Sequence, residues 1–368
     1  MSRTRKVLGA ILVVLVVAVV SFGLVLSHDS PCTASPVLRD TTNAISAITL
    51  RCYGPPDVLR VEQIEKPVPN DDEVLVRVHA AAVNPLDWHF VRGTPYLVRM
   101  QAGLGKPEDP RLGVDFAGTV ETVGKNVTRF KAGDEVFGGH NGAFGQYVRV
   151  RAVRAIAFKP ANMSFEQAAA VPIAGVTALQ ALRDKGHVQA GQRVLINGAS
   201  GGVGTFAVQI AKSFGAEVTG VCSTRNLQMV KSLGADHVID YTREDFTQGT
   251  QQYDLILDTV GNHPLLAYRH VLSPGGALVI VGGPSTGHWL GPLTTLGNAL
   301  LLSPFVSQKF VPILAELKQS DLVVLHDLMQ AGKLTPVIDR RYSLAAVPEA
   351  IRYVEAGHAR GKVVIDVD

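Results

Sequence analysis

The chain has 368 residues, enough for two or three domains of ordinary size. Apolar residues make up 46% of it, which is ample for buried cores, and its formal net charge of +3 comes without a long basic run. This pattern gives no support to nucleic-acid binding. The three cysteines, Cys32, Cys52 and Cys222, lie far apart without a C-x-x-C pair, so we expect neither a disulfide framework nor a zinc knuckle.

The first predicted element is an apolar helix. The run from Val7 to Leu26 carries no charge and follows Arg3, Arg5 and Lys6, and about 20 apolar residues is the length that spans a membrane. We therefore expect an uncleaved transmembrane anchor over 1–28, with a cleaved signal peptide as the alternative. The basic residues predict a cytoplasmic N-terminus. This orientation conflicts with a cofactor supplied inside the cell, so the side of the membrane is left open.

A polar segment without periodicity over 29–47 predicts a linker. After it, over 48–165, short strand candidates alternate with Gly- and Pro-containing turns, which predicts a barrel-like β domain. The main candidates are Leu50 to Tyr53, Leu59 to Gln63, Glu73 to Ala80, Asp115 to Val123, Glu135 to Gly138 and Gln146 to Ala152. Ser164 then caps a helix that extends to Ala170.

Beyond this helix, strands and helices alternate, which predicts a doubly wound parallel sheet. Its expected strands are Arg193 to Asn197, Glu217 to Cys222, His237 to Asp240, Leu255 to Thr259 and Ala277 to Val281. The apolar segment from Pro284 to Pro312 is too interrupted for a second membrane span, and we expect a helical lid, a substrate wall or a dimer contact there. A helix over Pro348 to Glu355 and a strand over Lys362 to Val367 close the chain.

A glycine-rich turn lies between the first of these strands and the helix that follows it. Gly198, Gly201, Gly202 and Gly204 come directly after Asn197. Backbone N–H groups and the positive end of a helix dipole can approach a pyrophosphate only where no Cβ intervenes. The turn therefore predicts a dinucleotide site, although its spacing departs from strict G-x-G-x-x-G.

The end of the second strand indicates which cofactor is bound. NAD sites usually carry Asp or Glu roughly 20 residues past the glycines, where it binds the ribose 2′-hydroxyl. Here Ser223, Thr224 and Arg225 stand instead, and they offer hydroxyl and guanidinium donors to a 2′-phosphate. The pattern favours NADPH over NADH. The alternative is that Arg225 is only a solvated residue at the start of a helix.

Several blocks of the sequence resemble the zinc-independent quinone oxidoreductases of the medium-chain dehydrogenase/reductase superfamily, a zeta-crystallin-like family. The block from Gly191 to Lys212 carries the signature, and 83–87, 113–118, 131–136 and 233–241 resemble further family blocks. The resemblance extends from Ile48 to Asp368. It implies an α/β fold: a GroES-like β-rich catalytic domain over 48–165, a Rossmann NADP-binding domain over 166–312, and a return to the catalytic domain over 313–368.

The resemblance also implies site residues. Asn84 is expected as an amide donor near the nicotinamide or substrate oxygen, and His89 as a donor of a hydrogen bond or proton. Asp87 is expected either to orient His89 or to cap the local helix, and a purely structural His89 is the alternative. The expected cofactor contacts are Thr177, Ser200, Gly201, Gly202, Val203, Ser223, Thr224, Arg225, Tyr241, Thr259, Val260, Val281, Gly282 and Lys362.

We expect no metal. Zinc-dependent relatives carry cysteine where Asn84 stands and Gly-His-Glu where 113–115 stands, and this chain lacks their four-cysteine lobe. Without a Lewis acid, oxidation of a simple alcohol becomes hard. We therefore predict an NADPH-dependent reductase of a small electron acceptor, a quinone or an α,β-unsaturated carbonyl. The alternatives are an enoyl-thioester reductase and a non-catalytic NADPH-binding protein. Among partners, the sequence is also compatible with a homodimer.

Overall fold

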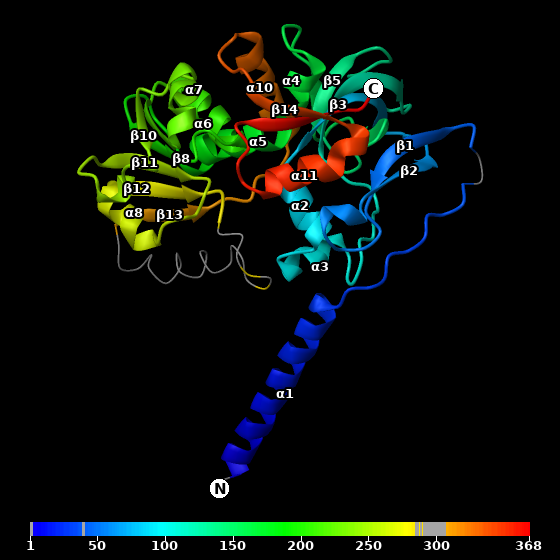
Figure 1. Cartoon of the computed structure of the whole chain (residues 1–368), viewed down its shortest axis with the longest axis horizontal. Coiled ribbons are helices and arrows are strands. Elements are labelled where there is room, and N and C mark those ends of the chain that lie inside the picture. The colour runs from blue at the N-terminus through cyan, green and yellow to red at the C-terminus, as the bar shows by residue number, and fades with distance from the viewer. Residues whose placement is uncertain (1–2, 39–40, 284–286, 288, 290–306) are drawn as a thin grey trace.

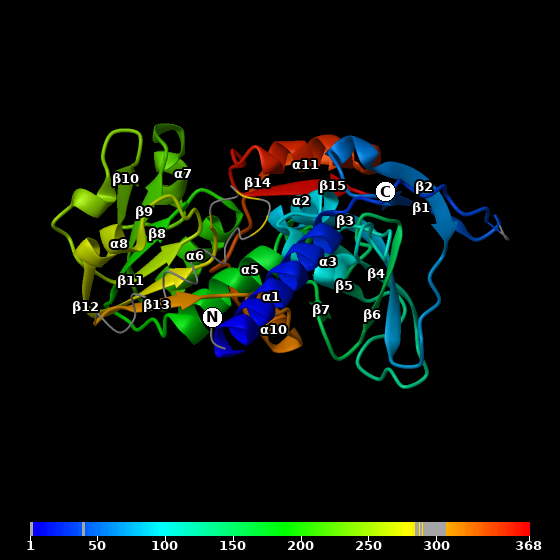
Figure 2. The ribbon, with the colours of Figure 1, turned by 90° about the horizontal axis from the view of Figure 1, so that it is seen from below.

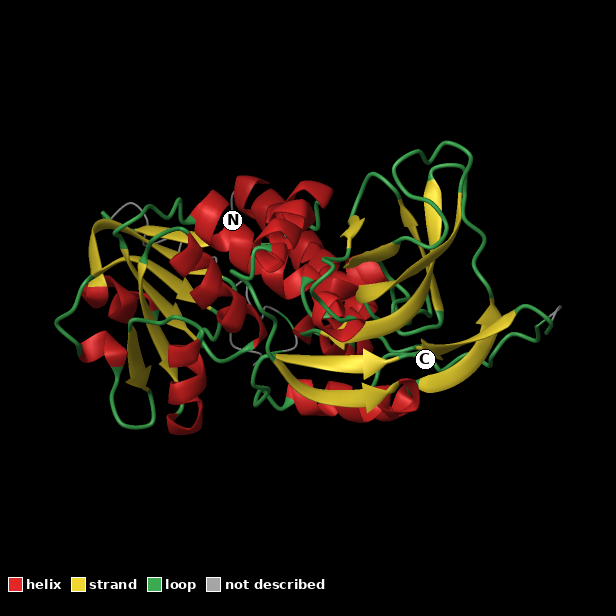
Figure 3. Ribbon diagram, turned by 90° about the horizontal axis from the view of Figure 1, so that it is seen from above, coloured by secondary structure: helices red, strands yellow, loops and turns green. Residues whose placement is uncertain are grey.

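The computed structural model describes residues 3–38, 41–283, 287, 289 and 307–368, with side chains from Ile11 onward. Two bodies, each built on its own sheet, lie side by side, and Figures 2 and 3 show helices between the two sheets. A helix, α1 (Arg3–Ser27), extends away from both bodies (Figure 1). The described chain therefore consists of an N-terminal helix and two bodies that meet along a helical layer.

The first body carries a six-stranded sheet in the order β10-β9-β8-β11-β12-β13, and every pairing in it is parallel. Its strands are short and largely buried, as strands covered on both faces must be. This is the predicted doubly wound sheet. The strands are β8 (Arg193–Asn197), β9 (Glu217–Cys222), β10 (His237–Asp240), β11 (Tyr253–Asp258), β12 (Leu272–Ile280) and β13 (Lys309–Pro312), and the helices are α6 (Gly202–Ser213), α7 (Leu227–Ser232) and α8 (Leu265–Val271).

The second body carries a mainly antiparallel sheet in the order β14-β15-β3-β4-β5-β7, with β6 paired to β3. The last strand, β15, pairs with β3, so the C-terminal segment belongs to this sheet. The strands are β3 (Glu73–Val83), β4 (Asp115–Val123), β5 (Glu135–Gly139), β6 (Tyr147–Arg151), β7 (Ile156–Phe158), β14 (Ile338–Ser343) and β15 (Lys362–Asp366), with the helices α2 (Pro85–Arg92), α3 (Arg99–Ala102) and α11 (Val347–Glu355).

Three further helices pack at the junction of the bodies: α4 (Phe165–Ala169), α5 (Pro172–Gln180) and α10 (Gln319–Gln330). Ser164 caps α4 by accepting a hydrogen bond from the Gln167 N–H at 3.2 Å, which confirms the predicted helix start. The bodies also touch at the glycine turn, where the Gly361 N–H donates to the Ser200 carbonyl at 2.9 Å. The C-terminal segment therefore contacts the turn that the sequence assigns to a pyrophosphate.

The predicted transmembrane anchor is wrong. Across the part of the chain that the structure describes, no helix is both long and apolar enough to cross a membrane. The single-pass membrane localisation and the membrane as a partner, which both depended on this anchor, are withdrawn with it.

The segment after α1 is attached to the second body rather than being a plain linker. Cys32 and Cys52 form a disulfide with their Cα atoms 4.6 Å apart, so the expectation that the cysteines build no disulfide framework does not hold for this pair. Their separation of 20 residues gives no sequence signal, because the pairing depends on how the intervening segment folds back. The predicted linker is also too long, since β1 (Ala44–Thr49) begins inside it and pairs with β2 (Arg60–Glu65).

Arg99 holds the end of α1 in place. Its side chain is 2% exposed, and Nη1 donates to the Leu26 and His28 carbonyls, both at 3.0 Å. Nη2 pairs with Asp29 at 2.8 Å. A positive charge at the last carbonyls of a helix interacts favourably with the negative end of the helix dipole. Arg99 therefore joins the N-terminal segment to the second body.

The apolar segment over Pro284 to Pro312 is only partly described. Residues 284–286, 288 and 290–306 lie outside the described residues, and with them most of the predicted lid. Its end, Lys309–Pro312, forms β13 at the edge of the parallel sheet, where the sequence predicted no strand. The strand predicted over Leu50 to Tyr53 is likewise displaced, because the paired residues of β1 end at Thr49.

Candidate cofactor and hydride-transfer site

The glycine turn has the shape that a pyrophosphate needs. It connects β8 to α6, and Gly201 stands at the N-cap of α6 without a side-chain cap on the first-turn N–H groups. Gly198 has a φ of +84°, and a Cβ there would collide with the Thr259 hydroxyl. A Cβ on Gly202 would lie 3.3 Å from Cδ of Lys362. The uncapped helix end and the missing side chains fit a bound phosphate group.

The residues predicted at the nicotinamide end lie together beside this turn. The Thr259 hydroxyl donates to the Asn197 carbonyl at 2.7 Å. The N–H groups of Val281 and Gly282 donate to the Asp258 carbonyl at 2.8 and 3.2 Å, and the Val260 N–H donates to the Asp258 carboxylate. These contacts gather the ends of β8, β11 and β12 at one edge of the sheet.

At the predicted 2′-phosphate end, sequence reasoning missed an acidic residue, Asp240. The Thr224 hydroxyl donates to Asp240 at 2.5 Å, and Thr242 donates to it through both its N–H and its hydroxyl. The Thr224 hydrogen bond is the largest of the effects that lower the pKa of Asp240. Thr224 therefore presents a lone pair, rather than the predicted hydrogen, to any neighbour.

Donors at this end come from Arg225 and Ser223. The Arg225 guanidinium is exposed and uses one N–H on the His358 carbonyl at 3.1 Å. Within the part of the chain that the structure describes, its other N–H groups donate to no acceptor. The Ser223 Oγ accepts from Asn226 at 3.2 Å, which leaves its own hydrogen free to donate. Tyr241 lies next to Asp240 with 59% of its surface exposed.

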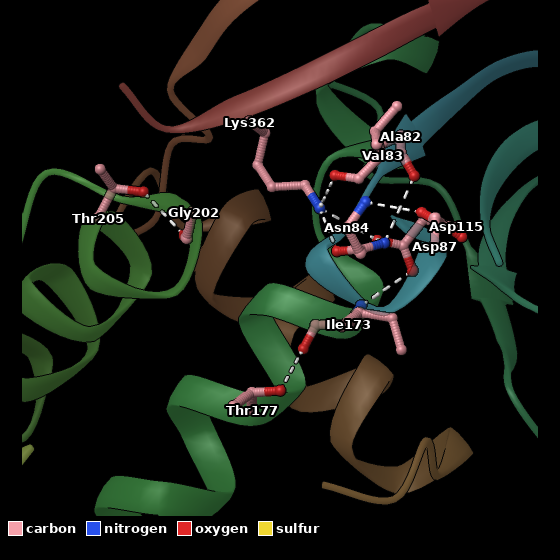
Figure 4. A network of polar contacts seen from close by, with 10 residues as sticks. All are labelled: Ala82, Val83, Asn84, Asp87, Asp115, Ile173, Thr177, Gly202, Thr205 and Lys362. Atoms are coloured by element: carbon pink, nitrogen blue, oxygen red, sulfur yellow. Dashed lines mark hydrogen bonds and ion pairs between the residues drawn. The ribbon is translucent and has the colours of Figure 1, made fainter. Parts of the chain in front are cut away.

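The buried centre of the site is a network around Lys362. Figure 4 shows its ammonium pointing toward Asn84 and Asp115. Lys362 Nζ lies 2.5 Å from Asn84 Oδ1, 3.2 Å from the Val83 carbonyl and 3.4 Å from Asp115 Oδ2. These three acceptors can take all three ammonium hydrogens. Because Lys362 is 3% exposed and Asp115 fully buried, this is a desolvated ion pair at the junction of the bodies.

Asn84 lies inside this network rather than facing an open pocket. It is 1% exposed, and its amide nitrogen donates to Asp115 at 2.9 Å and to the Ala82 carbonyl at 3.4 Å. Its oxygen receives the Lys362 hydrogen. In this geometry the amide hydrogens are already used, so Asn84 fixes the position of Lys362.

Asp87 caps its helix and does not touch His89. Its Oδ2 accepts from the Asn84 N–H at 2.7 Å in the first turn of α2, which is one of the two roles expected for it. Its Oδ1 is buried and has no hydrogen-bond partner among the described residues. Burial, followed in effect by the nearby Asp115 charge, raises the pKa of Asp87 to about 7 despite the Asn84 N–H. An unpartnered carboxyl oxygen beside another carboxylate is most stable when it is protonated.

His89 lies in the last turn of α2, partly buried against Trp88, with the ring centroids 3.5 Å apart. Its Nδ1 is 2.7 Å from the Thr94 carbonyl, which can only accept, so Nδ1 carries the hydrogen. Burial lowers the pKa of His89. The neutral ring therefore has an acceptor at Nε2, whereas the sequence-based expectation was a donor.

Two residues complete the site. Thr177 lies on α5, 8% exposed, with its hydroxyl donating to the Ile173 carbonyl at 2.7 Å. Asp115 was not among the predicted site residues, although the sequence analysis named 113–118 as a family block and 113–115 as a departure from a zinc motif. Within the described residues, no group of three or more His, Cys, Asp or Glu side chains is arranged to hold a metal.

Comparisons with known proteins identify the class. Residues 70–161 match the alcohol dehydrogenase GroES-like domain, and 233–365 match the zinc-binding dehydrogenase family. The chain is 35% identical to 2-methylene-furan-3-one reductase of Solanum lycopersicum, over 85% of this chain and 76% of that protein. It is 32% identical to the chloroplastic quinone-oxidoreductase homolog of Spinacia oleracea, over 85% and 95%.

Solved structures agree. The quinone oxidoreductase of Coxiella burnetii is 31% identical with a TM-score of 0.77, covering 88% of this chain and 100% of that one. The Escherichia coli quinone oxidoreductase complexed with NADPH is 26% identical with a TM-score of 0.75, over the same shares. A GroES-like body joined to a Rossmann body defines a medium-chain dehydrogenase/reductase. Within that superfamily of oxidoreductases, the chain belongs to the quinone oxidoreductase family.

Proposed function

We propose that this enzyme uses NADPH to reduce a quinone or an α,β-unsaturated carbonyl without zinc. The observation that carries the proposal is the placement of Lys362. Its stem packs on Gly202 in the phosphate turn, and its ammonium ends in the buried cluster of Asn84 and Asp115. One side chain thus reaches from the expected pyrophosphate to the catalytic body. Relatives named as quinone oxidoreductases and as an enone-type reductase support this reaction class.

NADPH, when bound, supplies a hydride. We propose that the α6 N-terminus, with Ser200, Gly201, Gly202 and Val203, holds its pyrophosphate, because these N–H groups lack a side-chain cap. Ser223, Arg225 and Tyr241 surround the 2′-phosphate, whereas the Thr224 hydrogen is taken by Asp240. The nicotinamide is bordered by Thr177, Thr259, Val260, Val281, Gly282 and Lys362. The complex of the Escherichia coli relative with NADPH supports this choice of cofactor.

The chain's own contribution to the reaction is electrostatic. One hydride and one proton convert a quinone to a hydroquinone, and negative charge develops on the carbonyl oxygen after the hydride arrives. The three hydrogens of the Lys362 ammonium already have acceptors. Lys362 therefore acts on such charge through its fixed position beside the proposed nicotinamide site, where water is excluded, rather than through a direct hydrogen bond. His89, with Nε2 as an acceptor, orients a hydroxyl on the acceptor or product. Neither step requires a metal.

The test is NADPH oxidation by the full chain with a panel of acceptors: a benzoquinone, a conjugated enone, a 2-enoyl thioester, and an alcohol with NADP⁺. We expect turnover of the quinone or enone, with NADH much poorer than NADPH. G202V is a matched probe, because a larger side chain there meets Lys362 and intrudes on the phosphate cradle. Strict NADH preference or zinc-dependent alcohol oxidation refutes the proposal. Turnover of the thioester alone supports the enoyl-thioester alternative, and tight NADPH binding without any turnover supports a non-catalytic role.

A further inference from the structure

Asp115 is bonded to three separate segments of the chain at once. It is the first residue of β4 and is fully buried. Its Oδ1 accepts from the Ile173 N–H at 3.0 Å. Its Oδ2 accepts from Asn84 Nδ2 at 2.9 Å and lies 3.4 Å from Lys362 Nζ. A single carboxylate therefore connects β4 to the start of α5, the start of α2 and the start of β15 (Figure 4).

Two of these segments carry a residue that the proposed function places beside the nicotinamide, and the third carries Asn84, which holds Lys362. The N–H bonded by Asp115 belongs to Ile173, and the Ile173 carbonyl receives the hydroxyl of Thr177 one turn later. The other two segments carry Asn84 and Lys362. Both side chains bond to the Asp115 carboxylate, and they also bond to each other. These bonds fix the positions of the three segments relative to one another.

Stability alone does not explain this arrangement. A buried ion pair contributes little net stability, because the cost of removing both charges from water offsets their attraction. What such a pair does provide is a fixed geometry, because leaving any one charge without its partner is strongly unfavourable. The Asp115 carboxylate also lies at the start of α5, where a negative charge interacts favourably with the positive end of the helix dipole.

We propose that Asp115 is a positioning residue for hydride transfer, fixing Lys362, Asn84 and the first turn of α5 relative to one another around the nicotinamide. This inference rests on the proposed function. It assigns to Asp115 no direct contact with cofactor or substrate.

The test is D115N in the full chain. An amide has the shape of the carboxylate but only one acceptor oxygen, so at least one of the three donors loses its partner and faces an N–H instead. We expect kcat to fall about 100-fold, the loss typical of misplacing reacting groups by an ångström. The Kd for NADPH changes far less, because the phosphate turn is untouched.

A pH profile separates positioning from simple structural support. Among the described titratable groups, Asp115 on β4 and Asp87 on α2 face the Lys362 ammonium, and both raise its pKa against the larger lowering effect of burial. D115N removes one of these two charges. The pH limb of kcat that belongs to Lys362 therefore moves to lower pH in the variant, whereas a merely structural defect leaves the limb in place.

D321N is the matched control. Asp321 is 2% exposed, accepts from Gln180 at 2.7 Å and pairs with Arg183 at 2.7 Å. It thus holds the other end of α5 in the same chemical way, away from the proposed nicotinamide site. D321N is expected to lower stability without changing kcat or the pH limb. An equal change of kcat in both variants overturns the proposal, as does a D115N enzyme with the wild-type kcat and pH limb.

Two further measurements keep the test decisive. If D115N does not fold, K362Q removes the same ion pair from β15, and a K362Q enzyme with wild-type kcat overturns the proposal. If no acceptor is reduced by the wild type, the proposed function fails on its own. Asp115 is then tested by the emission of bound NADPH, which reports the nicotinamide surroundings. We expect this emission to change in D115N and not in D321N, and identical emission in all three proteins contradicts the proposal.

Discussion

Replacing Asp87 by asparagine should change how the stability of this protein depends on pH. In the folded protein the pKa of Asp87 is raised from 3.8 to about 7, chiefly by burial and then by the neighbouring Asp115 charge. The folded state therefore binds the proton more tightly than the unfolded state does. The stability from this group is fully present below about pH 4, falls as the pH rises toward about 7, and stays constant above that.

The magnitude follows from the two pKa values. Raising the pKa from 3.8 to about 7 corresponds to ~4 kcal/mol of unfolding free energy between the two ends of this pH range. Asparagine keeps an oxygen for the Asn84 N–H but never ionises. As the pH rises, the free energy of unfolding of D87N should therefore increase relative to that of the wild type, by up to ~4 kcal/mol. Any constant cost of the new amide cancels in this comparison.

Urea denaturation of both proteins at about pH 4.5, 6 and 8 measures this difference directly. The pKa of Asp115 is also raised by burial, but its pH dependence is present in both proteins and largely cancels. Wild-type and D87N stabilities that stay parallel across the whole range would show that Asp87 ionises normally in the folded protein. The reasoning about an unpartnered buried oxygen would then be refuted.

Three further variants probe other parts of the chain. R225Q should weaken NADPH binding by roughly tenfold or more and leave NADH binding unchanged, because a guanidinium bond to phosphate is charge-assisted; titration of cofactor fluorescence checks both. D240N should strengthen NADPH binding in the same titration, since it removes a negative charge near the 2′-phosphate and frees the Thr224 hydrogen. R99M should destabilise the protein by about 1–3 kcal/mol, because the Leu26 and His28 carbonyls lose their hydrogen bonds from the buried guanidinium; thermal unfolding measures it, and an unchanged midpoint contradicts it.

The sequence predicted the fold well where local pattern and buried position agree. The parallel strands over Arg193–Asn197 and Glu217–Cys222 begin and end at the predicted residues, because a short apolar run between turn residues has few other solutions. β1 was missed because Ala44–Thr49 alternates only weakly, and its partner β2 is what makes it a strand. The Cys32–Cys52 disulfide was also missed because it depends on how the segment between the two cysteines folds back, which no local pattern indicates.

The sequence indicated which residues to expect at the candidate site, but it did not indicate how they are hydrogen-bonded. The family resemblance put Asn84, Thr177 and Lys362 on one list of expected site residues, and in the structure Asp115 bonds to Asn84, to Lys362 and to Ile173 one turn before Thr177. The direction of each hydrogen bond could not be foreseen. Whether Asn84 or Thr224 presents a hydrogen or a lone pair outward depends on a carboxylate that lies 31 or 16 residues away in the chain.

The charge of the buried cluster links these observations. Asp87, Asp115 and Lys362 would carry a net negative charge if all three were ionised, and a net charge without solvent is strongly disfavoured. Asp115 has three donors, one of which is the Lys362 cation, whereas Asp87 has one N–H and an oxygen without a partner among the described residues. The proton therefore resides on Asp87, and the ion pair of Asp115 with Lys362 remains neutral as a unit. This assignment requires that K362Q, which removes the cation of this three-residue cluster, raises the pH at which Asp87 and Asp115 ionise, so the destabilisation of K362Q grows as the pH rises.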